Sequence, residues 1–404
     1  MTAYILYNQL TGALIIYTSY RTVGNQLLPL MEYVWGNVGP SEFKILPEAV
    51  KESLMEAFLS ASRLHSRCFL RQCFCKSLSL LLDYLWSHNT APLRMRAMTA
   101  YYRSVSLRSI GRHERSDAVL CEMIRELDQN AKAEKNDVRL HCVRARLLLS
   151  RTENAIMRKD FNAAQNLFLS WEAQDPPSRL EVGLVRMKNT AIGRIWRYMG
   201  QFEQARQTFE PCLSGPHTGS AETHIKHHLA DVYCELGRPQ DAIRLISTDI
   251  NQLRAGSLKQ SKAFRRLALP LAEAYMRIKE LQPARDALEE SLAVYQSLTE
   301  PDVTDQLGHV RAMIGLARIH WYKKEREKAD INLRDAMDLA NRYVTFTDGC
   351  FDIAFIHLFH CLIKRHLAAK LLDSQPPRYY MAGTGTYLLS ELSVLMRLEA
   401  DIKT

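Results

Sequence analysis

One pattern recurs between residues 186 and 340 and limits what this chain can fold into. In each copy, a small residue is followed after three positions by an aromatic residue or histidine, then by an alanine with a large apolar residue four positions later. Small side chains let two helices approach closely, and large ones fill the grooves between them. The pattern therefore predicts packed helix pairs. The small residues are Gly193, Ala230, Ala272 and Ala317, and the later alanines are Ala205, Ala242, Ala284 and Ala329.

This pattern resembles the tetratricopeptide repeat (TPR), a pair of antiparallel helices that stacks on the next pair. Successive alanines of the second helices, beginning with Ala164 and ending with Ala329, lie 41, 37, 42 and 45 residues apart, compared with about 34 in the ideal repeat. Turn-forming residues at 176–177, 214–221 and 299–304 separate the copies. We expect an irregular array in which Phe161, Ala164 and Phe168 mark an earlier, degenerate member.

The composition favours an all-α protein. The 404 residues are 47% hydrophobic and 24% charged, and they include only 17 Gly and 14 Pro, which suits helices with short connections. The expected fold is a right-handed superhelical solenoid of antiparallel helix pairs with atypical terminal helices. Its expected parts are an N-terminal helical capping segment (1–95), TPR-like repeats (96–345) and C-terminal capping helices (346–404). Residues 2–18 are compatible with a helix or a hairpin, and we favour the helix.

Several features argue against metal, cofactor and membrane roles. The nine cysteines are an odd number scattered through apolar patterns, which predicts free thiols in a reducing compartment. His65, Cys68, Cys73 and Cys75 lack the paired spacing of structural zinc sites. The segment 382–386 lacks the lysine and the strand of a phosphate loop. The apolar stretch near the N-terminus has no preceding basic residue. We expect a cytoplasmic or nuclear protein without cofactor or metal.

The resemblance also implies where a partner would bind, because the first helix of each TPR pair lines a concave groove. Counting from the small residue of each copy gives candidate groove positions that are rich in arginine. The pattern of a chaperone-binding carboxylate clamp is not matched at these positions. The candidates are Thr190, Arg194, Arg197, Tyr198, His224, His227, Asp231, Glu235, Arg266, Glu273, Met276, Arg277, Arg311, Arg318, Trp321 and Tyr322.

Arginine presents a planar set of donors that pairs with carboxylate or phosphate, and Trp321 and Tyr322 offer an apolar wall. We therefore expect a non-catalytic scaffold that binds an acidic segment of a protein partner as a subunit of a larger complex. A simpler alternative stays open. The arginines pair within the protein, with Asp231, Glu235 and Glu273.

Two other functions are less favoured by the residues. A net charge of +9 and a basic series, first at Arg63, Arg67, Arg71 and Lys76 and then from Arg94 to Arg115, are compatible with nucleic-acid binding, although such series usually form solvated faces. His224, His227, His228 and Asp231 share one helix, which is compatible with a metal or a general base. The sequence has no H-E-x-x-H, G-x-S-x-G or Walker-type motif, so we do not expect an enzyme.

Overall fold

The computed structural model describes residues 92–109, 111–130, 137–158, 160–213, 220–255, 261–298, 301 and 303–342. Several predictions lie outside these residues: the N-terminal helix or hairpin, the His65 to Cys75 group, the cysteines at 350 and 361, and the 382–386 connection. Most of the two terminal capping segments also lies outside them, so the three-part division of the chain stays a prediction.

The chain separates into two compact units, residues 1–185 and 186–404. Every regular element among the described residues is an α-helix, as the composition predicts. The first unit contains α6 (Leu93–Ser109), α7 (His113–Gln129), α9 (Val138–Met157), α10 (Phe161–Leu169) and the start of α11 (Arg179–Tyr198). The second unit contains the rest of α11, then α12 (Phe202–Leu213), α13 (Ser220–Glu235), α14 (Pro239–Ala255), α15 (Lys262–Arg277), α16 (Leu281–Gln296), α17 (Val303–Tyr322) and α18 (Arg326–Arg342).

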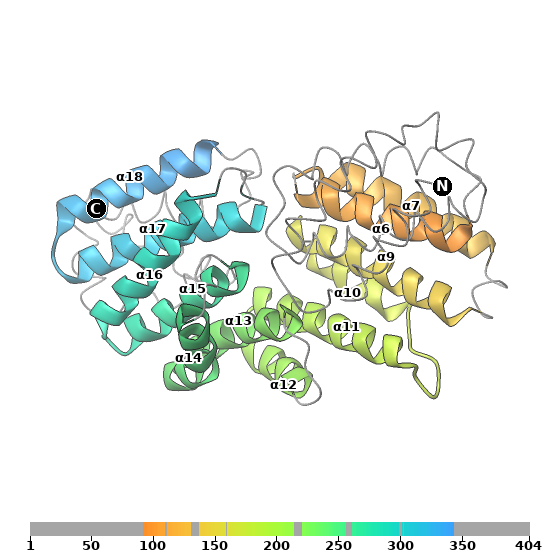
Figure 1. Ribbon diagram of the computed structural model, residues 1–404, viewed down its shortest axis with the longest axis horizontal. Helices are drawn as coiled ribbons and strands as arrows, with labels where there is room; N and C mark the ends of the chain where they lie inside the picture. The colour runs from red at the N-terminus through yellow and green to blue at the C-terminus, as the bar shows by residue number, and fades with distance from the viewer. Residues whose placement is uncertain are drawn as a thin grey trace, which may run out of the picture. The chain divides into compact units, whose positions relative to one another are not determined.

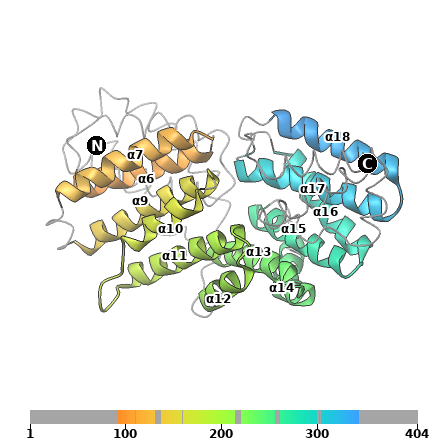
Figure 2. The same ribbon diagram turned by 180° about the vertical axis from the view of Figure 1, so that it is seen from behind.

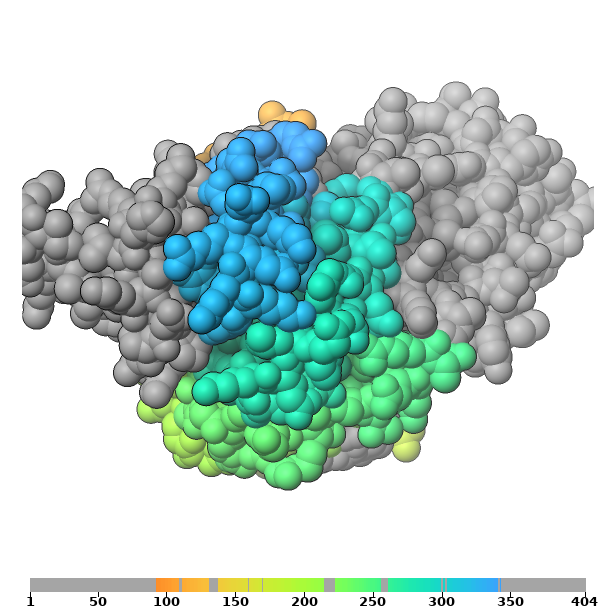
Figure 3. Space-filling view, turned by 90° about the vertical axis from the view of Figure 1, so that its left-hand side faces the viewer, coloured from red at the N-terminus to blue at the C-terminus, as the bar shows by residue number. Residues whose placement is uncertain are grey.

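Within the second unit, each helix packs on its neighbour in the chain from α12 to α18, and α15 also packs on α13 and α17. The two ribbon views agree that α17 and α18 run side by side (Figures 1 and 2). On the face shown in Figure 3, the surface passes from α18 through α16 and α17 to the green residues of α13 and α14. First helices therefore pack against the first helices of the neighbouring pairs as well as against their own second helices.

The turn inside a pair has the same geometry throughout the described residues. The second residue after the first helix has a left-handed φ between 62° and 78°. Its amide and the next amide donate to carbonyls of the last helical turn, for example Gly200 N to Arg197 O at 3.1 Å and Gln201 N to Trp196 O at 2.8 Å. This is the Schellman arrangement that ends a helix. The left-handed residues are Gly111, Gly200, Gly237, Lys279 and Lys324.

Lys279 and Lys324 are exposed and occupy a conformation that suits glycine. A left-handed conformation costs a residue with a Cβ atom roughly 1–2 kcal/mol. We expect Lys279→Gly and Lys324→Gly each to raise the free energy of unfolding by about 1 kcal/mol, measured by urea denaturation. Gly237→Lys is the reverse exchange and should lower stability by a similar amount. Equal destabilisation by all three variants would contradict this account of the turns.

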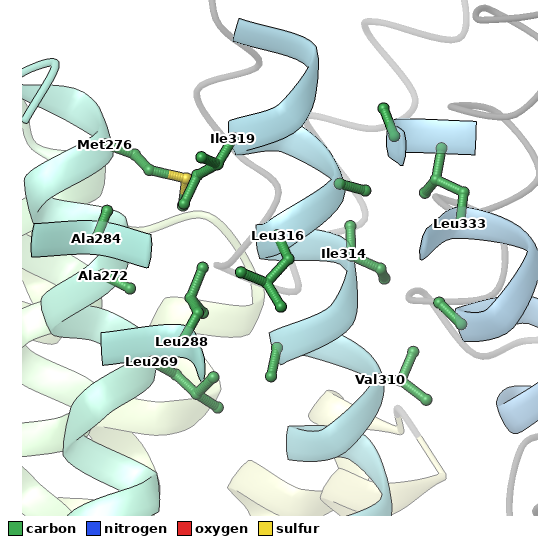
Figure 4. Close-up of a cluster of buried hydrophobic side chains, with 14 of the residues drawn as sticks. Leu269, Ala272, Met276, Ala284, Leu288, Val310, Ile314, Leu316, Ile319 and Leu333 are labelled. Carbon is green, nitrogen blue, oxygen red and sulfur yellow. The ribbon is translucent and has the colours of Figure 1, made fainter. Parts of the chain in front are cut away.

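The small residues lie where the pattern predicts close helix contacts. The alanines at 164, 205, 230, 242, 272, 284, 317 and 329 have no exposed surface. A Cβ atom on Gly193 in α11 would lie 2.7 Å from Cε1 of Phe209 in α12. In Figure 4, side chains of α15, α16, α17 and α18 meet in one cluster that includes Met276, Leu288, Ile314 and Leu333. The register of the sequence pattern is therefore the packing register of the second unit.

Two glycines of α11 provide a test of this close approach. Phe209 is fully buried and cannot move aside, so Gly193→Ala should lower the free energy of unfolding by about 1–3 kcal/mol through overpacking. At Gly183, on the same helix, a new Cβ atom meets nothing within 4 Å. Gly183→Ala should instead be neutral or raise stability by up to about 1 kcal/mol, because alanine favours a helix interior. Thermal unfolding measures both changes, and equal effects would contradict the predicted contact.

The first unit is held together by a buried polar network as well as by its apolar core. Ser116 of α7 donates to the Ser104 carbonyl of α6 at 2.9 Å, and Asn154 of α9 donates to the Ser116 hydroxyl at 2.9 Å. Arg108 donates to the Ser150 hydroxyl at 2.7 Å. Since each of these buried groups has a partner, the network fixes how the three helices face one another.

The start of α11 follows directly from its sequence. Ser178 and Glu181 form a reciprocal capping box: the Glu181 amide lies 3.3 Å from the Ser178 hydroxyl, and the Ser178 amide lies 2.8 Å from the Glu181 carboxylate. The Gln174 amide also donates to Glu181. Burial would raise the pKa of Glu181, but these hydrogen bonds outweigh it and lower the pKa. The helix therefore begins just after Pro176-Pro177, where the sequence predicts a connection.

The cysteines that the structure describes are free thiols, as predicted. Cys142, Cys212 and Cys234 are buried and Cys121 is partly buried. Burial raises the pKa of each thiol, which keeps the sulfur protonated and unreactive. Among the described residues, no helix combines the length and the apolar character needed to cross a membrane.

Candidate functional site

The predicted groove residues of the second unit lie on α11, α13, α15 and α17, and many of them contact one another. Their ion pairs join helices that belong to different pairs. We call the charged residues in these ion pairs the charged row. Its members are Arg197, Asp231, Glu235, Glu273, Arg277, Arg311 and Arg318.

Asp231 of α13 is the centre of one half of the row. Its Oδ2 lies 2.6 Å from Arg197 Nη2 of α11 and 3.6 Å from Arg311 Nη2 of α17. The side chains of Arg197 and Asp231 are 2% and 0% exposed. A buried carboxylate that lost its arginine would be an uncompensated charge, at a cost of about 3–5 kcal/mol. Asp231 therefore ties α11 and α17 to α13.

The other half of the row centres on Glu273 of α15, which has no exposed surface. Arg277 donates to one of its oxygens at 2.7 Å, and Arg318 of α17 donates to the other at 2.6 Å. Arg277 also reaches back to α13, where it donates to Glu235 at 2.8 Å and to the Cys234 carbonyl at 2.6 Å. Together these bonds link α13, α15 and α17.

The two glutamates of the row differ in protonation. Burial would raise the pKa of Glu273, but the guanidinium groups of Arg318 and Arg277 outweigh it and hold the pKa at about 2. For Glu235, burial dominates over the attraction of Arg277, and Glu273 and Asp231 add repulsion, so the pKa rises to about 8. Its Oε2 is buried without a hydrogen-bond partner. At neutral pH, Glu235 is therefore mostly protonated, whereas Glu273 is ionised.

A carboxyl with a folded pKa near 8 and an ordinary pKa of 4.5 holds a proton in the folded state that the unfolded chain lacks. Its contribution to stability therefore falls as the pH rises from about 5 to about 8. Glu235→Gln removes this titration and keeps an acceptor for Arg277. We expect the variant to gain stability relative to wild type as the pH rises, measured by urea denaturation across this range. Glu289→Gln, at an exposed carboxylate of α16, is the matched control. A constant difference for Glu235→Gln would place the Glu235 pKa near its ordinary value.

A proline in α15 explains how His227 is placed. Pro270 has no amide hydrogen, so the carbonyl of Arg266, four residues earlier, has no helical donor. His227 Nδ1 lies 2.8 Å from that carbonyl oxygen and donates to it. Burial lowers the pKa of His227 to about 3, so the ring is neutral. The sequence contains the proline four residues after Arg266, which indicates that the Arg266 carbonyl has no helical donor. It does not indicate that His227 is the partner of that carbonyl.

The histidine group of α13 does not take a metal-binding arrangement. His227 faces a carbonyl, and His228 Nδ1 lies 2.7 Å from Arg197 Nη1, which can only donate. In the part of the chain that the structure describes, no group of histidine, cysteine, aspartate and glutamate side chains is arranged to hold a metal ion.

Other predicted groove residues lie beside the row. The Arg197 guanidinium lies 5.5 Å from the centre of the Tyr198 ring. Trp321, expected as an apolar wall, is 7% exposed and belongs to the buried core of α15 to α18, with Arg326 5.8 Å from its ring centre. Met276 belongs to the same core, and Thr190 donates to the Arg186 carbonyl within α11. Arg194 is largely buried, whereas His224, Arg266 and Tyr322 are partly exposed.

Sequence reasoning missed one further ion pair of this kind. Arg265 of α15 donates to Asp305 of α17 at 2.8 Å, and both residues are buried. The pair lies outside the counted groove positions. Arg265 follows Phe264 and precedes an apolar stretch, but nothing in the sequence around Asp305 indicates a buried carboxylate.

The basic residues of the first unit are partly engaged in internal contacts. Arg96 of α6 pairs with Glu126 of α7, and Arg108 donates to α9. Arg112 and Arg115 are exposed. The earlier basic residues, 63–76, lie outside the described residues.

The comparisons with known proteins bear on the fold alone. No family model matches the sequence, and no curated protein is significantly similar to it. The structure is similar to the crystal structure of a Rap protein complexed with Competence and Sporulation Factor, with a TM-score of 0.55. The match covers 87% of this chain and 98% of that chain at 11% identity. This similarity supports the TPR-like helical-repeat fold that the sequence pattern predicts.

Proposed function

We propose that this protein is a non-catalytic scaffold that binds an acidic segment of a protein partner along the first helices of its second unit. The observation that carries the proposal is the charge balance of these helices. At the predicted groove positions, arginines outnumber carboxylates. The arginines are Arg194, Arg197, Arg266, Arg277, Arg311 and Arg318, and the carboxylates are Asp231, Glu235 and Glu273.

The proposal assigns different roles to buried and accessible members. Arg197, Glu273 and Arg318 are almost fully buried and hold the helices together. Arg266, Arg311 and Tyr322 keep part of their surface exposed, so they are the residues that a partner reaches. Carboxylates of the partner would accept hydrogen bonds from the accessible guanidinium groups.

The wider arrangement belongs to the same proposal. Helix pairs that repeat one turn geometry favour a right-handed solenoid with a concave face lined by first helices. The expected division into 1–95, 96–345 and 346–404 would then comprise an array with a cap at each end. Among the known structures, the Rap protein was crystallised with Competence and Sporulation Factor, which fits a binding role for this fold. A place inside the cell, within a larger complex, follows from this role.

Binding of a labelled glutamate-rich peptide to the full chain, followed by fluorescence anisotropy, tests the proposal. Arg318 is unsuitable for substitution, because its loss would leave Glu273 buried without one of its arginines. Arg266→Gln with Arg311→Gln should weaken binding at least about tenfold, since hydrogen bonds to charged groups contribute about 1.5–3 kcal/mol each. Arg244→Gln with Arg334→Gln removes the same charge from exposed positions on α14 and α18 and should leave the affinity unchanged.

Equal losses in both double variants would show attraction by net charge alone and would overturn the proposed binding role of Arg266 and Arg311. A single-stranded RNA that displaces the peptide and binds more tightly than it would favour the nucleic-acid alternative. In that case, Arg112→Gln with Arg115→Gln in α7 should weaken RNA binding. Circular dichroism of every variant checks that the helices are retained.

A further inference from the structure

His228 of α13 carries a buried hydrogen-bond donor without an acceptor. Arg197 Nη1 lies 2.7 Å from His228 Nδ1. A guanidinium group only donates, so Nδ1 accepts and the ring proton of the neutral histidine lies on Nε2. His228 is 5% exposed, and its Nε2 has no hydrogen-bond partner. An unsatisfied buried donor is costly, and native proteins rarely leave one without a compensating group.

His224, one turn earlier on α13, adds a second such atom. Its Nδ1 is also buried without a hydrogen-bond partner. The rings of His224 and His228 are in edge contact, with centres 4.6 Å apart. Two unsatisfied imidazole nitrogens therefore belong to one small group of side chains. The ring of Phe209 in α12 stacks on His228, 6.1 Å away.

The charged groups that act most strongly on these two rings are basic. Arg194 acts on both rings, Arg197 of α11 acts on His228, and Arg266 and Lys262 of α15 act on His224. The carboxylate of Asp231 acts on the neighbouring His227, where Arg311, Arg197 and Arg266 oppose it. A water molecule would satisfy the imidazole nitrogens but carries no charge. An oxyanion would accept the same hydrogen bonds and would also be attracted by the surrounding basic groups.

We propose that His228 Nε2 and His224 Nδ1, together with Arg194 and Arg266, form a subsite for one oxyanion group, either a carboxylate or a phosphate. This inference rests on the proposed function, because the subsite would receive one acidic group of the partner segment. The imidazole nitrogens supply directed donors, and the arginines supply charge. His227 takes no part, since its Nδ1 is already used by the Arg266 carbonyl.

The arrangement makes binding depend on pH in a defined direction. Burial lowers the pKa of His224 and of His228, and the surrounding basic groups lower both further, so the rings are neutral without a ligand. A bound anion raises the pKa of His224 and favours its protonated ring, whereas His228 stays neutral because its Nδ1 accepts from Arg197. Binding therefore takes up at most one proton. The affinity for an anion of constant charge should increase by up to about tenfold per pH unit as the pH falls through the range in which the anion-bound His224 ring becomes protonated.

Isothermal titration calorimetry of the full chain with sulfate and with acetate tests the subsite. Sulfate represents a phosphate group and acetate a carboxylate. Titrations in two buffers of different ionisation enthalpy at one pH give the number of protons taken up. His228→Asn keeps an acceptor for Arg197 but removes the Nε2 donor, and His224→Gln removes the Nδ1 atom. His309→Gln is the matched control, because His309 of α17 is also largely buried and stacks on Tyr295, 5.8 Å away.

We expect wild type and His309→Gln to bind one of the two anions with proton uptake. His228→Asn and His224→Gln should bind it at least about tenfold more weakly, and His224→Gln should bind it without proton uptake. The anion that binds identifies the partner group as phosphate-like or carboxylate. Three outcomes would overturn the subsite. Wild type could bind an anion without proton uptake, all variants could bind as tightly as wild type, or wild type could bind neither anion. Circular dichroism and melting of each variant separate lost binding from lost folding.

The glutamate-peptide measurement keeps the two proposals distinguishable. If the peptide binds through Arg266 and Arg311 but neither histidine variant affects it or anion binding, the subsite is wrong and the scaffold function stands. If sulfate or acetate binds with proton uptake but the peptide does not bind, the row does not accept an acidic segment, and the subsite belongs to a small anion.

Discussion

The second unit depends on arginine and carboxylate side chains that are buried between its first helices. A buried charge is costly unless an opposite charge lies beside it. Asp231 and Glu273 each form ion pairs with arginines from two helices. A shift of one helix along its neighbour would separate these partners, so the charged row fixes the register that apolar packing alone would leave adjustable.

Close backbone approach makes this burial possible. Gly193 admits the ring of Phe209, and fully buried alanines let the other pairs approach. The left-handed turns set the angle at which each second helix returns. Pro270 then adds a local irregularity: it frees the Arg266 carbonyl, which becomes the acceptor for His227, whose ring is kept neutral by burial. Packing, turns and electrostatics therefore constrain the same helices.

The arginines and carboxylates of the first helices differ in how far they stabilise the fold and how far they take part in the proposed binding. The simpler alternative from the sequence, in which arginines pair with Asp231, Glu235 and Glu273, describes Arg197, Arg277 and Arg318. Arginines outnumber carboxylates at the predicted groove positions. The proposed acidic ligand complements this composition, since complementary charge favours the correct partner over others.

The sequence by itself determined the helical class, the pairing of helices and the register, because small residues recur at a fixed distance from large apolar ones and turn residues separate the copies. It also identified the helices that carry the arginines. It did not determine which arginine meets which carboxylate, since Arg311 and Asp231 are 80 residues apart, nor that Trp321 enters the core. Only the tertiary structure decided those points, because the burial and pairing of a charge depend on which helices stack together. Local periodicity contains no information about contacts between residues that are far apart in the sequence.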